Sequence, residues 1–366
     1  MSATPILRSH ASLEALRDDW NALAASWRTP LLDHEWFASC SEALHPGADL
    51  RVVVGRQAGA VEGIAPLVLE ETAAGRRLTL LGTSRLFEPS GWLYGSSGVL
   101  GTLLGPALGC GAPMLLPRVA AGSPLCREIT GLTRGRGIAV VRDTAPSFAV
   151  PTRGSWTAYY QTLSSRITTN LPRLRRKAER ELGPMQAVDR NPSRQEVDAL
   201  LETLIAVEHS GWKGRRGSSL ASRQDLQRFF RAYCQRAAAK RQLRVSTLSF
   251  GSQIAAVELS IDAYDRLWQL KIGYHEAVAE YYPGLHLTQH SIRTAFDRGL
   301  EAYEFLGGAE SWEERWRPER RPYQTLLVYP FSASGVVGAC RDFAGAMLRR
   351  AQTVVRPGPA AARAHA

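Results

Sequence analysis

Cysteine is scarce in this chain, and its spacing argues against a metal site and against a disulfide framework. Five cysteines occur among the 366 residues, and none belongs to a Cys-x-x-Cys pair. We therefore expect no metal site and no disulfide framework, and this usage favours a reducing cytoplasm. The first twenty residues contain charged side chains and lack the apolar run of a secretory signal, which favours the same cytoplasmic location.

Charge is missing from residues 89–117, a stretch long enough to span a bilayer. The stretch contains seven glycines and four prolines, with Pro106 near its middle. Because proline interrupts helices, we predict buried strands and turns there rather than one continuous helix, and no transmembrane segment. Peripheral contact with a membrane surface is the alternative.

Positive charge is in excess, with 45 Lys and Arg against 34 Asp and Glu. The excess suits an anionic partner, which could be a nucleotide cofactor, a nucleic acid or an acidic lipid surface. A predicted basic amphipathic helix at residues 164–182 could bind either of the last two, and a packed helix with one solvated face explains it equally well. Because no known nucleic-acid-binding motif accompanies it, we do not expect a nucleic-acid partner.

The most informative feature is a degenerate internal repeat. Residues 50–70 resemble residues 243–262: each run opens with Leu-Arg-Val, turns at a glycine (Gly59 or Gly251) and returns as a second β-rich run. A third β-rich run follows each hairpin, at residues 76–82 and 265–273. Chance similarity between two short hairpins is the alternative interpretation.

This repeated order predicts an α/β fold of two tandem domains, each with a mixed, mostly antiparallel sheet flanked by helices. We place the first domain at residues 1–150 and the second at residues 151–335. Residues 336–366 are expected to form a C-terminal helix and a disordered tail. The join between the domains is expected in the Pro-, Gly- and Ser-containing stretch 147–156.

A Pro-Gly corner, Pro283-Gly284, separates a predicted strand from a predicted amphipathic helix. The first N–H groups of a helix lack intrahelical partners, so helix starts bind anions and phosphates in particular. A plain turn is the alternative. The matching place in the first half is the uncharged stretch, which offers no comparable helix start, so we expect the site in the second domain, with the first as scaffold or substrate wall.

Four segments carry a resemblance to a known superfamily: residues 155–183, 208–219, 271–284 and 304–316. They resemble the GNAT acyltransferases. More closely, the chain is similar to the tandem-GNAT family of cellulose-biosynthesis-associated (CelD/BcsL-type) acetyltransferase-like proteins, which is related in architecture to the Fem-type aminoacyl transferases. Two features depart from the pattern, since a single glycine stands at the phosphate corner and Trp312-Glu313 replaces a common Tyr-Lys.

The resemblance implies an N- or O-acyltransferase that moves an acetyl or acyl group from acetyl-CoA or another acyl-CoA to a small-molecule or carbohydrate acceptor, in polysaccharide or envelope metabolism. A non-catalytic GNAT-like binding module of an envelope-polysaccharide assembly is the alternative. In the implied site one strand holds the thioester and the next helix start holds the pyrophosphate. The corresponding residues are Leu270, Lys271, Tyr274, Pro283, Gly284, Leu285 and His286.

Direct acyl transfer also needs a group that takes the proton of the nucleophile. Our candidates are Glu258 in a predicted strand, Glu310 after paired glycines and His209 near a predicted helix end. A solvent-facing strand position, a surface loop charge and a helix-end contact are the respective alternatives.

An arginine-rich loop could bind phosphates or an anionic acceptor, and nearby tryptophans could wall a sugar or an acyl chain. A solvated loop and ordinary core packing are the alternatives. The candidate substrate-binding residues are Trp212, Lys213, Arg215, Arg216 and Trp312.

Overall fold

The computed structural model describes residues 4–210 and 220–355. We call the residues up to Pro151 the first half and those after it the second half. The helices of the first half are α1 (His10–Glu14), α2 (Arg17–Ala24), α3 (His34–Ala43), α4 (Leu100–Gly109) and α5 (Pro124–Leu132). Its strands are β1 (Ile6–Leu7), β2 (Asp49–Leu50), β3 (Val52–Gln57), β4 (Ala60–Ala65), β5 (Leu67–Thr72), β6 (Gly75–Leu80), β7 (Leu93–Tyr94), β8 (Met114–Ala120) and β9 (Gly137–Pro151).

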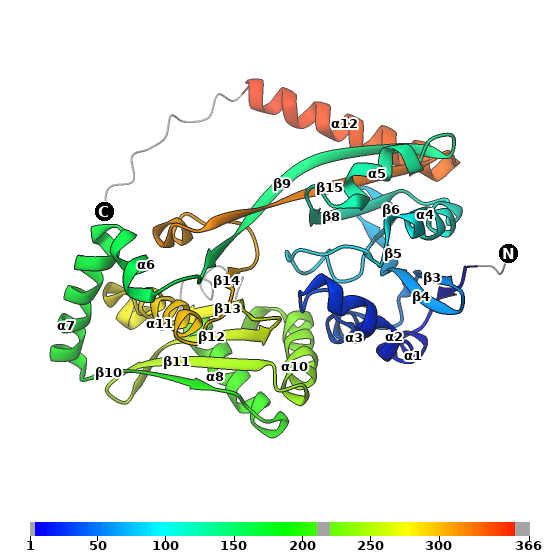
Figure 1. Cartoon of the computed structure of the whole chain (residues 1–366). Helices are drawn as coiled ribbons and strands as arrows, with labels where there is room; N and C mark the ends of the chain where they lie inside the picture. The colour runs from blue at the N-terminus through cyan, green and yellow to red at the C-terminus, as the bar shows by residue number, and fades with distance from the viewer. Residues whose placement is uncertain (1–3, 211–219, 356–366) are drawn as a thin grey trace.

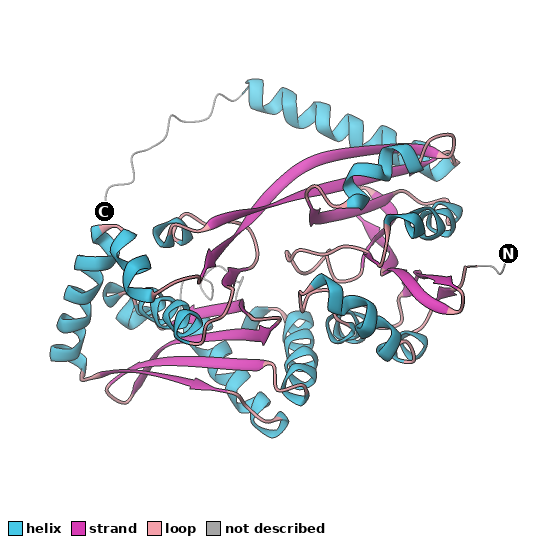
Figure 2. Ribbon diagram, in the orientation of Figure 1, coloured by secondary structure: helices cyan, strands magenta, loops and turns pink. Residues whose placement is uncertain are grey.

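The second half contains the same two kinds of element. Its helices are α6 (Trp156–Thr162), α7 (Leu171–Leu182), α8 (Val197–Ser210), α10 (Gln224–Ala239), α11 (Pro283–Asp297) and α12 (Ala333–Val355). Its strands are β10 (Met185–Arg190), β11 (Leu243–Phe250), β12 (Gln253–Ala263), β13 (Arg266–Tyr274), β14 (Ala302–Phe305) and β15 (Glu319–Pro330). The helices flank mostly antiparallel sheets, which confirms the predicted α/β class (Figure 2).

The internal repeat is visible in the strand pairing. Both predicted hairpins form, β3–β4 and β11–β12, and their turn glycines have positive φ angles of 88° at Gly59 and 57° at Gly251. In each half a later strand, β6 or β13, leads through a helix to a strand that pairs with it in parallel, β8 or β14. The hairpin and the parallel crossover therefore recur in both halves, but β3 and β4 lie in a separate four-stranded sheet with β1 and β7, whereas β11 and β12 belong to the large sheet. The division into two tandem domains stays a prediction.

The sheets of the two halves are joined, which the sequence did not predict. The last strand of each half pairs with a strand of the other half: β9 with β14, and β15 with β8. β9 and β15 also pair with each other along almost their whole length. The result is one hydrogen-bonded sheet of eleven strands, in which β9 and β15 run between the halves (Figure 1).

The uncharged stretch contains a helix, so our expectation of strands and turns alone was wrong. α4 occupies the place that α11 occupies in the second half, and Pro106 lies inside it. Leu103, Leu104 and Ala107 of this helix are fully buried. Burial of such side chains contributes about 1.5–3 kcal/mol each, which offsets the ~3 kcal/mol that an internal proline costs. None of the described helices is both long and apolar enough to cross a membrane.

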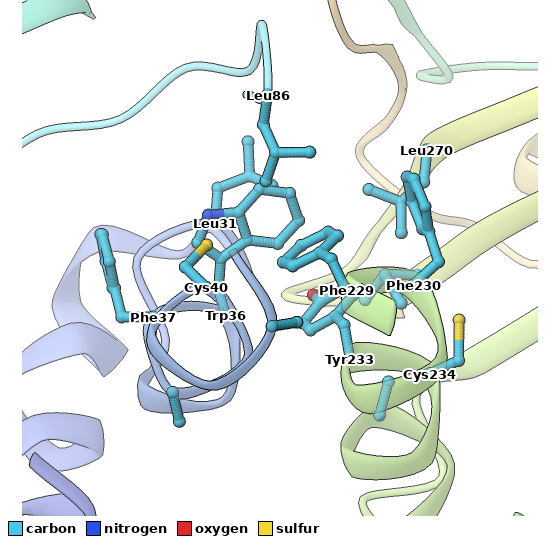
Figure 3. Close-up of a cluster of buried hydrophobic side chains, with 14 of the residues drawn as sticks. Leu31, Trp36, Phe37, Cys40, Leu86, Phe229, Phe230, Tyr233, Cys234 and Leu270 are labelled. Carbon is cyan, nitrogen blue, oxygen red and sulfur yellow. The ribbon is translucent and has the colours of Figure 1, made fainter. Parts of the chain in front are cut away.

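A buried cluster joins helices α3 and α10 of the two halves (Figure 3). Trp36 of α3 makes edge-to-face contacts with Phe229 and Tyr233 of α10, with ring centroids 5.0 and 4.9 Å apart. Lys240, just after α10, forms ion pairs with Asp33 and Glu35 at 3.5 and 3.1 Å. The halves are thus held together by an apolar core as well as by strand pairing.

The predicted basic helix is a packed helix with a solvated face. A π-helical turn (Arg166–Asn170) leads directly into α7, with Pro172 in its first turn. Its apolar positions, Leu171, Leu174 and Ala178 among them, are buried. The C-terminal helix that we expected is α12, and the predicted disordered tail after Val355 lies outside the described residues.

Cutting the chain at the predicted domain boundary tests the shared sheet. A fragment of residues 151–335 lacks β9, so β14 loses one of its two neighbours and β15 loses both. We expect this fragment to show no cooperative thermal unfolding by circular dichroism, whereas the whole chain unfolds cooperatively. A fragment that gives a sharp transition and a dispersed amide NMR spectrum would contradict this account.

Candidate functional site

The candidate site lies where β13 and β14 diverge. Their parallel pairing ends at Gln269 and Phe305, while β13 continues to Tyr274. Lys271 to Tyr274 therefore pair with β12 on one side, and no strand of the described residues pairs with residues 270–274 on the other. Such an open backbone edge can pair with an extended amide-containing ligand.

A β-bulge lies at the point of divergence. Leu259 of β12 faces Lys271 and its neighbour Ser260 faces Gln269, so Leu270 is the extra residue. A bulge leaves one residue outside the regular ladder and turns its N–H group and side chain in a new direction. Leu270 and Lys271, both predicted to bind the donor, thus occupy the irregular part of the strand.

The Pro-Gly corner is the start of α11. Tyr282 precedes it with left-handed angles (φ 53°, ψ 51°), and Pro283 is the first helical residue. No hydrogen bond of the Gly284 or Leu285 N–H groups is present within the described residues. A Cβ added at Gly284 would meet only the Tyr274 ring, at 3.5 Å, so the predicted helix start and the predicted donor strand are in contact.

His286 was predicted to supply a free N–H group, and the structure contradicts this. Its N–H donates to the Tyr282 carbonyl at 3.2 Å. Its imidazole is buried, and burial together with the nearby Arg175 guanidinium lowers its pKa to about 4. His286 is therefore a neutral core residue, which leaves two N–H groups at the helix start for an anion.

Glu258 lies beneath α11 and is fully buried. Its carboxylate accepts hydrogen bonds from the hydroxyls of Ser260 at 2.7 Å and Tyr303 at 3.0 Å. Burial raises its pKa, and these hydrogen bonds oppose the increase. This arrangement suits a structural carboxylate enclosed in the core better than a base that meets an incoming acceptor.

The other sequence candidates lie nearer the surface. Glu310 is exposed and accepts a hydrogen bond from the indole of Trp312 at 2.8 Å, and this indole packs against Phe305 of β14. His209 is exposed at the end of α8, beside the site, because Gly273 of β13 contacts the preceding residue, Glu208. Four predicted substrate-binding residues, Trp212, Lys213, Arg215 and Arg216, lie outside the described residues.

Glu88 was missed by sequence reasoning, and it lies at the same place. It comes from the loop between β6 and β7 of the first half, and its carboxylate accepts the N–H of Gly307 at 2.7 Å, directly beyond β14. Burial raises the pKa of Glu88 to about 7, although the charges of Lys271 and Arg118 act in the opposite direction. A carboxyl group with a pKa near neutrality is suited to proton transfer.

Arg118 fixes the segment that Glu88 contacts. Its guanidinium donates to the carbonyls of Ala145, at 2.8 Å, and of Gly307. It also lies between the rings of Phe87 and Tyr323, with its central carbon 4.5 and 4.8 Å from their centroids. The segment after β14 is thus contacted by the loop between β6 and β7 and by Arg118 of β8, which also contacts β9 and β15. Both halves therefore contribute residues to the site.

Comparison with known proteins identifies the second half. Residues 165–314 match the family model described as the acetyltransferase (GNAT) domain. The second half therefore carries a GNAT acetyltransferase domain, and the resemblance to that superfamily is confirmed. The cellulose-associated family assignment stays a prediction, and no curated protein matches the sequence significantly.

Solved structures show the same fold along nearly the whole chain. FemX superposes with a TM-score of 0.57 at 11% identity, covering 86% of this chain and 96% of its own. The C-terminal domain of a protein assigned as a lysylphosphatidylglycerol synthetase from Agrobacterium fabrum gives 0.52 at 10% identity, covering 90% and 95%. L-PGS from Bacillus licheniformis gives 0.51 at 13% identity, covering 84% and 90%. At these identities the likeness concerns the fold alone.

Replacing Glu88 by glutamine tests the burial of its charge. The folded state keeps the Glu88 proton up to about pH 7, whereas the unfolded chain releases it near pH 4.5, so folding loses stability as pH rises between these values. Glu88→Gln is therefore expected to raise the free energy of unfolding at pH 8 by on the order of 1–2 kcal/mol and to change little at pH 4. Denaturant unfolding at both pH values measures this difference.

The matched control is Glu314→Gln, which changes an exposed carboxylate near the same site. It should leave the free energy of unfolding almost unchanged at either pH. A Glu88→Gln protein that is destabilised at pH 8, or equally stabilised at both pH values, would show that the carboxyl is not a buried, titrating group.

Proposed function

We propose that this protein is an acyltransferase that moves an acetyl or other acyl group from a coenzyme A thioester to an amine or hydroxyl acceptor. The observation that carries the proposal is the open edge of β13 beside the start of α11, within a GNAT acetyltransferase domain. A coenzyme A thioester has an extended amide-containing arm and a pyrophosphate. The edge of β13 can pair with the arm, and the start of α11 can bind the pyrophosphate.

The donor is proposed to enter between β13 and β14. Its arm would pair with the backbone of residues 270–274, and its pyrophosphate would accept the N–H groups of Gly284 and Leu285. The N–H group at the Leu270 bulge would stabilise the negative charge that develops on the thioester oxygen. A helix start alone contributes only about 1 kcal/mol toward an anion, so further cations are needed, and the loop that contains Lys213, Arg215 and Arg216 remains our choice.

Glu88 is proposed to take the proton of the attacking amine or hydroxyl. It lies near the divergence of β13 and β14, because its carboxylate accepts the N–H of Gly307. The charge of Lys271 on β13 is close enough to lower the pKa of Glu88. Its pKa of about 7 gives a substantial ionised fraction at neutral pH while keeping the group basic. We prefer it to the enclosed Glu258 and to Glu310 at the surface.

The acceptor class is proposed from the wider resemblance. FemX and the C-terminal domain of a protein assigned as a lysylphosphatidylglycerol synthetase share the fold, and the second name concerns a phospholipid. We extend this to the present chain as a proposal that its acceptor belongs to envelope or polysaccharide metabolism, including cellulose biosynthesis.

Substitution of Gly284 by valine tests the donor site. The φ angle of Gly284 is ordinary, so no backbone strain arises, and the added branched side chain lies against Tyr274 at the helix start. We expect the affinity for coenzyme A to fall by about tenfold or more, ~1.4 kcal/mol, with little change in thermal stability. Isothermal calorimetry with coenzyme A gives the affinity.

Gly131→Val in α5 is the matched control, since an added Cβ there meets no atom within 4 Å. Its affinity for coenzyme A should equal that of the original protein. If Gly284→Val binds as tightly as the control, the corner is only a turn. If the unsubstituted protein binds no coenzyme A, the non-catalytic module becomes the better description.

The pH dependence of thioester turnover tests Glu88. We expect the rate to rise as pH passes through about 7, because the ionised carboxylate is the active form. Glu88→Gln should lower the rate by ~100-fold or more and abolish its increase with pH. Glu310→Gln should leave the rate and its pH dependence unchanged. A thiol-release assay across pH 5–9 gives the profiles, and an unchanged profile for Glu88→Gln would exclude it as the base.

A further inference from the structure

A cavity of about 250 Å³ lies between the two halves, next to the candidate site. Its first-half wall comes from residues 27–32, the loop 89–94 that directly follows Glu88, and residues 119–125. Its second-half wall comes from the strands β13, β14 and β15. Trp268 of β13 lines it two residues before the Leu270 bulge, and Pro89 lines it directly after Glu88, so the cavity wall adjoins the site residues along the chain.

Aromatic side chains from both halves line the cavity. Trp27 and Trp92 contribute from the first half, and Trp268 and Tyr323 from the second. The Trp27 ring is held edge-to-face against Tyr94, with centroids 4.8 Å apart. Flat aromatic faces of this kind pack well against the apolar face of a ring-shaped ligand.

The charged groups of the wall are paired with one another. Arg28, Arg266 and Arg321 line the cavity, and each guanidinium already bridges two carboxylates within the described residues. The partners are Asp265 (2.9 Å) and Glu301 (3.0 Å) for Arg28, Glu304 (3.0 Å) and Glu301 (3.2 Å) for Arg266, and Glu319 (3.3 Å) and Glu304 (3.4 Å) for Arg321. This network of three guanidinium groups and four carboxylates offers donors and acceptors to a neutral ligand and has no excess of positive charge for an anion.

Three wall residues also carry hydrogen-bonding groups without a partner in the described structure. These are the indole N–H groups of Trp27 and Trp92 and the hydroxyl of Ser90. Buried polar groups are rarely left unpaired in folded proteins, because an unmade hydrogen bond costs free energy. These three atoms have almost no solvent-accessible surface, so they lie within the wall and do not face the open space of the cavity.

We propose that this cavity is the acceptor site of the acyl transfer and that it holds a neutral, polyhydroxylated ring, that is, one sugar unit. The inference rests on the proposed acyltransferase function and deepens it. The volume lies just below the ~300–1,000 Å³ of pockets for drug-sized ligands, which suits a single ring. An apolar ring face meets the aromatic wall, and ring hydroxyls both accept from and donate to the polar groups.

The chemistry that follows is O-acyl transfer. A ring hydroxyl oxygen attacks the thioester carbon, the new C–O ester bond forms and the C–S bond breaks. The hydroxyl proton passes to the Glu88 carboxylate, and then to the sulfur of the departing coenzyme A thiolate. No oxidant, reductant or further reactant is needed.

Gly91 allows the cavity to be filled without disturbing the fold. It lines the cavity, its φ angle is ordinary, and a Cβ added there meets no atom of the described residues within 4 Å. Gly91→Leu therefore places an apolar side chain in open space within the proposed site. Gly131→Leu makes the same change at an open position away from the cavity and is the matched control.

The experiment is saturation-transfer NMR on the whole protein without coenzyme A. The probes are glucose, galactose, N-acetylglucosamine and cellobiose, with glucose 6-phosphate and benzoate as anionic and aromatic comparisons. We expect at least one neutral sugar to bind, with affinity reduced about tenfold or more by Gly91→Leu and unchanged by Gly131→Leu. Thermal unfolding verifies that each variant is folded.

Calorimetry with coenzyme A separates this inference from the proposed function. Coenzyme A binding without binding of any neutral sugar, preference for either comparison probe, or a sugar signal unaffected by Gly91→Leu would overturn the sugar site and leave acyl transfer standing. Sugar binding that Gly91→Leu abolishes, without coenzyme A binding, would uphold the site and overturn the acyltransferase.

Discussion

The antiparallel pairing of β9 with β15 is the interaction on which the rest of the structure depends. Each of these strands is the last strand of its half, and each pairs on its outer side with a strand of the other half. A half cut away from its partner would therefore expose unpaired strand edges in the middle of its sheet, which is a costly arrangement in water and prone to aggregation. The repeat thus forms a single folded body in which two similar topologies share their central strands.

The joined sheet also positions Glu88 of the first half beside the segment that follows β14. Because β14 lies directly beside β9, the segment that follows β14 runs against the first-half loop, and Gly307 comes within hydrogen-bonding distance of Glu88. Arg118, at β8, holds both the end of this segment and Ala145 of β9. Glu88 is half-buried, and a carboxylate withdrawn from water in this way is costly unless it is bonded or used; here a single backbone N–H bonds it. The first half accordingly contributes a titrating group as well as a wall.

The sequence analysis succeeded where local patterns decide the structure. The tight turns at Gly59 and Gly251 and the helix start at Pro283 follow from backbone preferences of glycine and proline, which act over a few residues. It failed at Pro106, because burial of the surrounding leucines stabilises α4 despite the proline. It also placed a break at residues 147–156, where β9 continues to Pro151, with a register shift against β15 near Pro146. The strands that pair with β9, β14 and β15, supply the stability that the local sequence of β9 lacks.

The sequence predicted those parts of the site that depend on local patterns and missed those that depend on contacts between residues distant in the chain. The donor strand and the helix start are contiguous in sequence, so their proximity could be inferred from one βα unit. Glu88 stands in an ordinary-looking Glu-Pro-Ser-Gly loop, and its burial arises only through a contact with Gly307, far along the chain. Glu258 shows the reverse case: its place on a buried strand could be predicted, but not that Ser260 and Tyr303 would enclose it.

A crystal structure of the complex with coenzyme A tests the central claim most directly. The account predicts density for the pantetheine arm along residues 270–274, with the thiol near Leu270 and the pyrophosphate at the N–H groups of Gly284 and Leu285. Density for the cofactor elsewhere on the protein, with the edge between β13 and β14 left empty, would contradict it.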